Sequence, residues 1–265
     1  MSLVRRALGT ERVGHLGTLD PFAAGLLVIV VGRATRLAAF ALEWDKAYEG
    51  VIRLGVTTAT DDATGAPVAT SDGWRGLDRA RVEQAVAGLR GAYEQRPPAY
   101  SAVKVAGERA YRRARRGEPV APPPRRVAVS ELDLVSCEPP DLAFRATVSG
   151  GTYVRALARD LGEALGCGAH LARLTRTRVG PYRLADAVPP ESVTAGALRD
   201  SAELVRGLPR RELDAAERDA VLHGRPLPAE RGEGARVALF AGSELVAVAE
   251  RVGEVLKPRV VVAEP

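Results

Sequence analysis

Residues 14–21 read Gly-His-Leu-Gly-Thr-Leu-Asp-Pro, a stretch that places one carboxylate, Asp20, in a glycine-rich loop. Glycine allows backbone conformations that are closed to other residues, and Pro21 fixes its own φ and disfavours the helical region for Asp20. Residues 25–32 follow as Gly-Leu-Leu-Val-Ile-Val-Val-Gly, an apolar run that predicts a fully buried strand. The loop therefore holds Asp20 rigidly beside a core element, which suits a catalytic carboxylate, although an aspartate before a proline can equally cap a turn.

The chain has 265 residues, enough for one large domain and a smaller one. The most apolar run, residues 26–31, is too short to cross a bilayer, and no secretory segment is recognisable at the start, so we expect a cytoplasmic protein. The two cysteines, Cys137 and Cys167, are far apart, which favours reduced thiols. Cys167 and His170 are two candidate ligands without a second pair, so we expect neither a metal nor another cofactor.

Positive charge is concentrated between residues 96 and 126, where nine Lys or Arg face two Glu for a local net charge of +7, against +5 for the whole chain. This segment, which we call the basic segment, also carries Tyr100 and Tyr111 between two groups of prolines. A solvated helix face would interleave charges of both signs, so the composition predicts a nucleic-acid-binding surface. A loosely ordered basic loop without a ligand is the alternative.

Hydrophobic periodicity predicts strands over residues 46–54 and 142–148. It also predicts three helices, over residues 34–42, over residues 78–89 with Asp78 as N-cap, and from Val154 to a stop at Gly166. The polar, turn-rich residues 58–72, which include the acidic doublet Asp61-Asp62, predict a solvated loop. Arg155 lies near the start of the third helix and off its apolar stripe, so it can face a ligand.

The pattern weakens around residue 208, where we expect a domain boundary. Beyond it lie three short β-like runs, at residues 237–240, 245–249 and 259–262. Short strands at close spacing are typical of a small barrel or sandwich.

Several stretches, in order along the chain, resemble the bacterial tRNA pseudouridine synthase B (TruB) family, whose members isomerise uridine 55 in the T loop of tRNA. Residues 14–21 resemble the motif of the catalytic aspartate. Further matching stretches are Asp-Lys-Ala-Tyr at 45–48, Pro-Pro-Ala-Tyr-Ser-Ala-Val-Lys at 97–104, Gly-Thr-Tyr-Val-Arg at 151–155 and Gly-Cys-Gly-Ala-His-Leu at 166–171. The resemblance implies an α+β fold, with a mixed, largely antiparallel sheet flanked by helices and a small C-terminal β-barrel-like domain of the PUA type.

By this resemblance, residues 1–208 form the catalytic domain, with an RNA-gripping insertion at about 96–126, and residues 209–265 form the PUA-type RNA-binding domain. The family normally begins with a strand and an Asp-Lys-Pro segment upstream of Met1, so we expect that the chain is truncated at its N-terminus or that its start is misassigned. The implied partner is tRNA, bound through its T stem-loop by a monomer.

The resemblance also implies the site residues. Asp20 takes the place of the catalytic aspartate, Tyr48 of the tyrosine that stacks on the target base, and Arg155 of the arginine that pairs with the aspartate and would keep it charged and oriented. His15 would help to hold the flipped RNA, while Tyr153 and Leu174 would line the uracil site. The RNA-binding residues of the insertion would be Tyr100, Lys104, Arg112, Arg113, Arg115 and Arg116.

Conversion of uridine to pseudouridine breaks the N1–C1′ bond, turns the base and joins C5 to C1′, with the base flipped out of its stack. A carboxylate can act as nucleophile at the sugar or as a base that removes a sugar proton, and the residues leave both routes open. Two other functions compete. A non-catalytic RNA-binding or tRNA-folding module would leave Asp20 unexplained, and a glycoside hydrolase or nucleosidase would normally need a second carboxylate at a matched distance.

Overall fold

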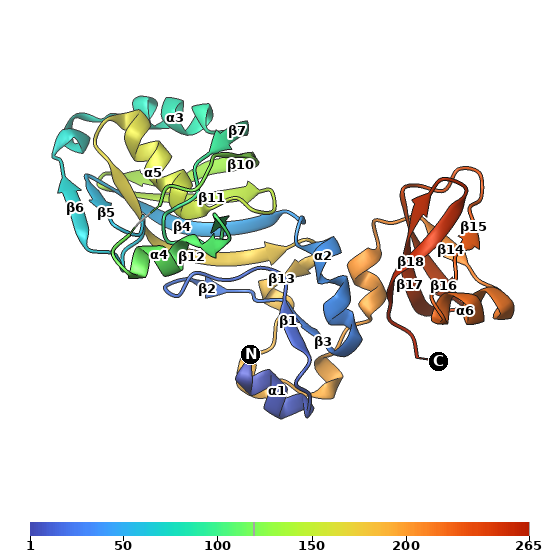
Figure 1. The fold of residues 1–265 in the computed structure, drawn as a ribbon. Coiled ribbons are helices and arrows are strands. Elements are labelled where there is room, and N and C mark those ends of the chain that lie inside the picture. Colours follow the sequence, from blue (N-terminus) through green and yellow to red (C-terminus); the bar gives the residue numbers. More distant parts are fainter. Residues whose placement is uncertain (119, 265) are drawn as a thin grey trace. The chain divides into compact units, whose positions relative to one another are not determined.

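The structure, a computed structural model, describes residues 1–118 and 120–264. It consists of two compact units, which are treated separately below (Figure 1). The larger unit comprises residues 18–27 and 43–187, and the smaller unit comprises residues 1–17, 28–42 and those from 188 onward. Within the described residues, no helix is both long and apolar enough to span a membrane.

The larger unit is built on a seven-stranded sheet. Its strand order is β13 (Tyr182–Arg183), β12 (Ala169–Val179), β4 (Lys46–Leu54), β11 (Asp141–Val148), β10 (Arg125–Glu138) and β7 (Gly91–Gln95), with β2 (Ala24–Gly25) pairing with β12 outside this order. The β2–β12 pair is parallel, and the other pairs are antiparallel. The strands predicted over residues 46–54 and 142–148 are confirmed as β4 and β11.

Two helices, α3 (Arg79–Gly88) and α5 (Val154–Leu165), pack against this sheet (Figure 1). Both predicted ends are confirmed: the Asp78 carboxylate accepts a hydrogen bond from the Arg81 N–H at 2.8 Å, and α5 ends at Gly166 with a φ of 76°. The core between helices and sheet is formed by buried apolar side chains, among them Ile52, Val82, Val86, Leu142, Phe144, Leu157 and Leu161. This core gives α5 a fixed position, and Arg155 lies in its first turn.

The other elements of the larger unit are short. They are β5 (Val56–Thr58), β6 (Pro67–Thr70), the 3-10 helices η2 (Gly73–Gly76) and η3 (Leu184–Asp186), β8 (Lys104–Val105), β9 (Glu108–Arg109) and α4 (Ala110–Arg115). The predicted solvated loop over residues 58–72 is wrong in two respects. It contributes Thr58 and β6 to the β5–β6 hairpin, and Asp62 within it is only 3% exposed.

The smaller unit contains two groups of elements. The first group is α1 (Ser2–Leu8), β1 (Val13–His15), β3 (Ile29–Val31), η1 (Gly32–Leu37) and α2 (Ala38–Ala41), followed later in the chain by η4 (Pro190–Ser192), η5 (Ala195–Ala197) and η6 (Ser201–Val205). The helix predicted over residues 34–42 is therefore present as a 3-10 turn that continues into a short α-helix.

The second group of the smaller unit is a five-stranded sheet with one helix. The strand order is β14 (Arg210–Glu212), β16 (Arg236–Ala241), β17 (Glu244–Val252), β18 (Val255–Val261) and β15 (Leu227–Pro228), and α6 (Ala215–Leu222) packs against it. The sheet curls into a half-barrel, as expected for a PUA-like domain (Figure 1). The three predicted C-terminal strands correspond to β16, β17 and β18.

The single buried strand predicted over residues 25–32 is wrong. The run is divided between β2 and β3, and of the β3 residues only Val30 is buried. The cause lies at Gly25, whose φ is 102° and where a Cβ atom would lie 2.3 Å from the backbone carbonyl oxygen of Arg176. Only glycine allows this approach, and the paired residues of β2 end at Gly25.

Candidate active site

The Asp20 loop, residues 18–27, lies against β12 of the larger unit. A turn within it is closed by a 2.9 Å hydrogen bond from the Ala23 N–H to the Asp20 carbonyl, and the Leu26 N–H donates to the Arg176 carbonyl at 2.8 Å. The loop thus has one backbone bond that closes its turn and one that joins the residues after the turn to β12. The Asp20 side chain keeps 26% of its surface exposed, so the carboxylate remains open to a ligand.

Arg155 forms a two-pronged ion pair with Asp20. Its Nη2 donates to Asp20 Oδ1 at 2.7 Å and its Nε donates to Oδ2 at 3.0 Å. A planar guanidinium that meets both carboxylate oxygens fixes the orientation of the carboxylate as well as its position. The two residues are 135 positions apart in sequence. Arg155 reaches Asp20 because α5, which carries it, packs against the sheet.

Arg155 itself is buried and has further acceptors. It donates to the carbonyls of Thr60 at 2.9 Å and Tyr100 at 3.1 Å, and its Nη1 lies 3.5 Å from Asp62 Oδ2. The sequence pattern placed Arg155 off the apolar stripe of α5, yet the residue is only 5% exposed because these acceptors surround it. A buried guanidinium with several satisfied donors has little freedom to leave Asp20.

Asp62, which we expected in a solvated loop, is part of this network. Its Oδ1 accepts hydrogen bonds from the Thr60 hydroxyl at 2.7 Å, the Thr64 N–H at 2.9 Å and the Thr64 hydroxyl at 2.6 Å. Polarity alone suggested exposure, yet a carboxylate with this many donors can be buried. The available signal was the spacing of Thr60, Asp62 and Thr64, because an aspartate often bonds to the backbone two residues onward.

Tyr48 lies on β4, directly opposite Arg176 on β12. Burial raises the pKa of the Tyr48 phenol, and the negative charge of the nearby Asp20 raises this pKa further. The charge of Arg176 and a hydrogen bond from Arg176 act in the opposite direction. Tyr48 is 8% exposed, and Leu174, on the same strand as Arg176, is 6% exposed. The structure therefore brings Asp20, Arg155 and Tyr48 into one electrostatic environment.

Tyr153 is the residue that precedes α5, and it is half-buried. Its N–H donates to Gln95 Oε1 at 2.8 Å, its carbonyl accepts from Gln95 Nε2 at 3.2 Å, and the Arg125 guanidinium lies 4.7 Å from the centre of its ring. Gln95 is fully buried and was not recognised from the sequence. It joins the start of α5 to β7.

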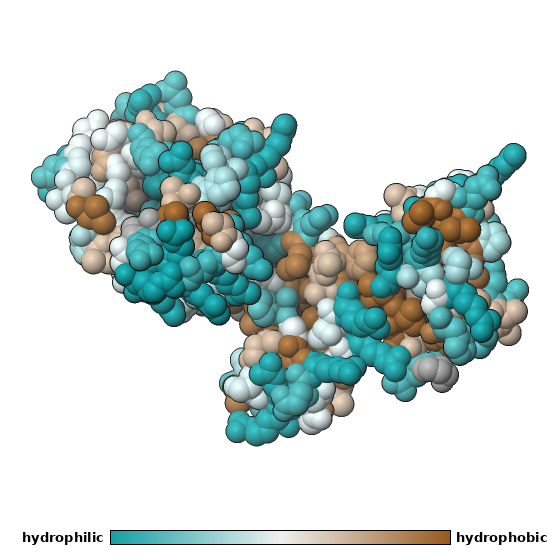
Figure 2. All heavy atoms as spheres, in the orientation of Figure 1, coloured by the Kyte–Doolittle hydropathy of each residue, from teal (hydrophilic) through white to brown (hydrophobic). Residues whose placement is uncertain are grey.

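The basic segment forms the β8–β9 pair and α4, so it is not a structureless loop. Lys104, Arg112, Arg115 and Arg116 are exposed, and Arg113 is half-exposed. Arg116 pairs with Glu108 at 2.6 Å, and the Arg115 guanidinium lies 5.5 Å from the ring centre of Tyr111. Hydrophilic side chains gather over α4 in Figure 2. The Tyr100 hydroxyl lies inside this segment, 3.5 Å from the Ala114 carbonyl.

His15 belongs to β1 of the smaller unit, and its buried Nδ1 has no hydrogen-bond partner among the described residues. His170 of the larger unit is buried, with Nδ1 2.9 Å from the Val56 carbonyl. In the described parts of the chain, no group of three or more His, Cys, Asp or Glu is arranged to hold a metal ion.

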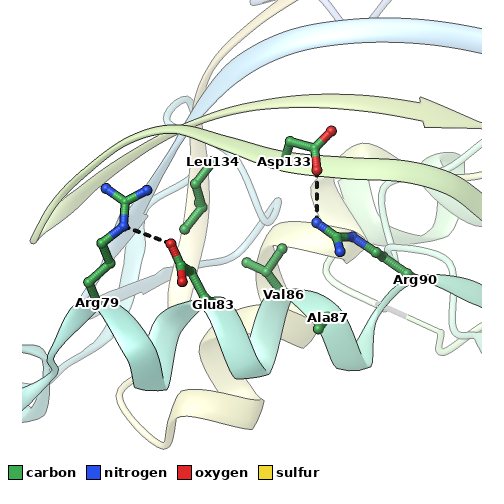
Figure 3. A pocket seen from close by; sticks show the side chains of 7 residues that line it. All are labelled: Arg79, Glu83, Val86, Ala87, Arg90, Asp133 and Leu134. Carbon is green, nitrogen blue, oxygen red and sulfur yellow. Dashed lines mark hydrogen bonds and ion pairs between the residues drawn. The ribbon is translucent and has the colours of Figure 1, made fainter.

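A shallow pocket lies elsewhere on the larger unit, between α3 and β10 (Figure 3). Val86, Ala87 and Leu134 line it, and ion pairs of Arg79 with Glu83 and of Arg90 with Asp133 border it. None of the predicted site residues lines this pocket, and its charges are already paired with each other.

Comparisons with known proteins agree with this architecture. A family model described as TruB family pseudouridylate synthase (N terminal domain) matches residues 5–154, and one described as tRNA pseudouridylate synthase B C-terminal domain matches residues 155–215. The tRNA pseudouridine synthase B of Thermobifida fusca (strain YX) is 44% identical over 98% of this chain and 92% of its own length. That of Aromatoleum aromaticum (strain DSM 19018 / LMG 30748 / EbN1) is 41% identical over 94% and 83%, respectively.

Solved structures show the same fold at lower identity. The archaeal box H/ACA sRNP Nop10–Cbf5 complex contains a chain that aligns with a TM-score of 0.71 and 22% identity, over 99% of this chain and 80% of that one. A Cbf5–Nop10–Gar1 complex aligns with a TM-score of 0.70, 24% identity and the same coverage. The resemblance inferred from the motifs is confirmed, and the chain belongs to the TruB family of pseudouridylate synthases.

Proposed function

We propose that this protein converts uridine 55 in the T loop of tRNA into pseudouridine. The observation that carries the proposal is the partly exposed Asp20 carboxylate, held at both oxygens by the buried Arg155 in a member of this enzyme family. Pseudouridine formation in tRNA follows from the family and from relatives that match nearly the whole chain. The choice of the T-loop uridine and the roles of individual residues are the proposed part.

Asp20 acts at the sugar of the flipped nucleotide. Its carboxylate can attack C1′ or remove a sugar proton, and both routes break the N1–C1′ bond and free the base to turn. Arg155 orients the carboxylate through the two-pronged pair. Because the protein alone already forms the pair, little reorganisation is needed when the nucleotide arrives.

Tyr48, Leu174 and Tyr153 surround the uracil in this proposal. Stacking on the Tyr48 ring would offset part of the free-energy cost of unstacking, which is about a few kcal/mol. Leu174 supplies an apolar wall, and Tyr153 is held in place by its two bonds to Gln95. His15 is assigned to holding the flipped RNA on the basis of the family motif in residues 14–21.

The basic segment holds the RNA backbone in this proposal. Tyr100, Lys104, Arg112, Arg113, Arg115 and Arg116 offer exposed or partly exposed groups to the phosphates and bases of the T stem-loop. We assign residues 1–208 to the catalytic domain and residues 209–265 to a PUA-type accessory RNA-binding domain, which β14–β18 and α6 support. We further propose that the protein acts as a monomer in the cytoplasm, because Asp20, Tyr48 and Arg155 come from a single chain and the proposed substrate is tRNA.

The test is an incubation with tRNA transcripts, followed by carbodiimide modification and mapping of reverse-transcription stops. A stop at position 55 that depends on active enzyme is the expected result. A stop at another uridine would contradict the T-loop assignment. Binding of tRNA without any modification would favour a non-catalytic RNA-binding or RNA-folding module instead.

A further inference from the structure

Arg176 is the largest fully buried side chain in the described part of the larger unit, at 1% exposed, and the mechanism above does not use it. Removing a guanidinium from water costs free energy unless its donors are satisfied. The groups that satisfy them therefore indicate what the side chain holds in place.

Two of its acceptors belong to the Asp20 loop. Arg176 Nε donates to the Leu26 carbonyl at 2.8 Å, and Nη1 donates to the Thr18 carbonyl at 3.3 Å. These carbonyls flank Asp20, one on each side of the loop. The backbone of Arg176 also takes part, because its carbonyl accepts the Leu26 N–H, and Gly25 allows this approach.

The third contact of Arg176 is with Tyr48. The two residues are direct partners across the β4–β12 pair, and the guanidinium hydrogen-bonds to the Tyr48 side chain. Immediately after Arg176, β12 contains one extra residue, since Arg176 faces Tyr48 while Arg178 faces Ala47. Such a bulge commonly redirects a side chain beside an active site.

We propose that Arg176 is a positioning residue for the reaction: one guanidinium holds both sides of the Asp20 loop and the Tyr48 hydroxyl, so that carboxylate and phenol face the same uridine. Arginine suits this task because its planar fork presents donors in several directions, whereas lysine has one nitrogen. The inference rests on the proposed function, and it adds a residue that does not itself touch the substrate.

The experiment compares Arg176→Lys and Arg176→Met with the parent protein and with Arg178→Lys as a matched control. Arg178 lies two residues further along β12 and donates to the Gly180 carbonyl at 3.2 Å, away from the loop. For each variant we would measure the single-turnover rate of pseudouridine formation at saturating enzyme, the Kd for tRNA and the melting temperature. We expect Arg176→Lys to lower the rate by about 10- to 100-fold with the Kd within about threefold, and Arg178→Lys to leave both nearly unchanged.

A double-mutant cycle with Tyr48→Phe separates positioning from general destabilisation. If Arg176 acts partly through the Tyr48 hydroxyl, the rate penalty of Arg176→Lys shrinks in the Tyr48→Phe background, whereas a purely structural effect is the same in both. An Arg176→Lys rate within about threefold of the parent, or an equal penalty in both backgrounds, overturns the inference. Should Arg176→Met fail to fold, the lysine variant alone decides. If the parent protein itself forms no pseudouridine, the proposed function is refuted instead, and the measurement on the parent distinguishes the two failures.

Discussion

The Asp20 site and the basic segment both depend on arginines, but the two regions use them in opposite ways. Arg155 is 5% exposed and meets two carboxylates and two carbonyls, whereas Arg112 and Arg115 on α4 are exposed to solvent. In the first region, fixed geometry in a water-poor setting determines what each charge does. In the second region the charges are exposed to solvent, and exposed positive charges attract phosphates roughly additively and are screened by salt. The first arrangement is suited to chemistry and the second to binding.

Replacing the carboxylate should have the largest effect. Asp20→Asn keeps nearly the same shape but removes the reacting group, so we expect the single-turnover rate to fall by at least about 10³-fold. The Kd for tRNA should stay within about tenfold, because binding depends mainly on phosphate contacts. Measuring both quantities on one preparation tests the division between chemistry and binding, and substantial turnover by the variant would refute the catalytic role.

Arg155→Lys should come next. Lysine cannot bond to both oxygens of Asp20, so we expect the rate to fall by about 10²-fold or more. Arg53→Lys is the matched control, since Arg53 makes an equally two-pronged pair with Asp141, at 2.7 Å for both bonds, but in an exposed position. The exposed pair should be worth less than about 1 kcal/mol of stability and nothing for activity. If both substitutions lowered the rate equally, the buried Arg155–Asp20 pair would have no greater role in the reaction than the exposed Arg53–Asp141 pair.

Removing charge from α4 should affect binding instead of chemistry. Replacing Arg112, Arg113, Arg115 and Arg116 together with Gln should weaken tRNA binding by about 10- to 100-fold at moderate salt and flatten the dependence of log Kd on log salt concentration. The rate at saturating enzyme should remain close to that of the parent. Titrations at two salt concentrations measure the slope, and an unchanged slope would exclude these residues from phosphate contact.

Tyr48→Phe should reduce the rate by about tenfold with little change in Kd, because the ring still stacks but the hydroxyl is lost. Burial raises the pKa of the Tyr48 phenol above its usual value near 10, so the group stays protonated from pH 6 to 9. The rate profile of the parent should therefore show no limb from Tyr48 in that range. Full activity of the phenylalanine variant would show that the hydroxyl has no role.

The smallest expected effect concerns Lys46. Burial and the charge of Arg176 lower the pKa of its amine from 10.5 to about 8. Between these values the unfolded chain holds more protons than the folded protein, so the free energy of unfolding rises with pH across this window. We expect a gain of about 1–2 kcal/mol relative to a Lys46→Met variant measured at the same pH values. Denaturant titrations at pH 7.5 and 10 measure the free energy of unfolding of both proteins. An equal change of this free energy with pH in the parent and in Lys46→Met would contradict the prediction.

Local signals in the sequence were sufficient for much of the fold. The alternating pattern of residues 46–54 located β4 correctly, Asp78 marked the start of α3, and Gly166 marked the end of α5. Each of these depends on a few neighbouring residues, because strand alternation, a capping carboxylate and a glycine with positive φ act within one or two turns of chain. The loop motif around Asp20 is equally local, since its glycines, its proline and its carboxylate lie within eight consecutive residues.

The sequence by itself thus determined several elements, among them β4, α3 and α5, and which aspartate is the candidate catalyst. Only the tertiary structure decided that Asp62 is buried beside Arg155, that Arg176 holds the Asp20 loop, and that residues 25–32 divide between β2 and β3. The physical reason is the same in each case. A charged side chain can be buried only where donors and acceptors from distant parts of the chain converge on it. Likewise, the strands with which an apolar run pairs, which can lie far away in the sequence, decide whether it forms one strand or two.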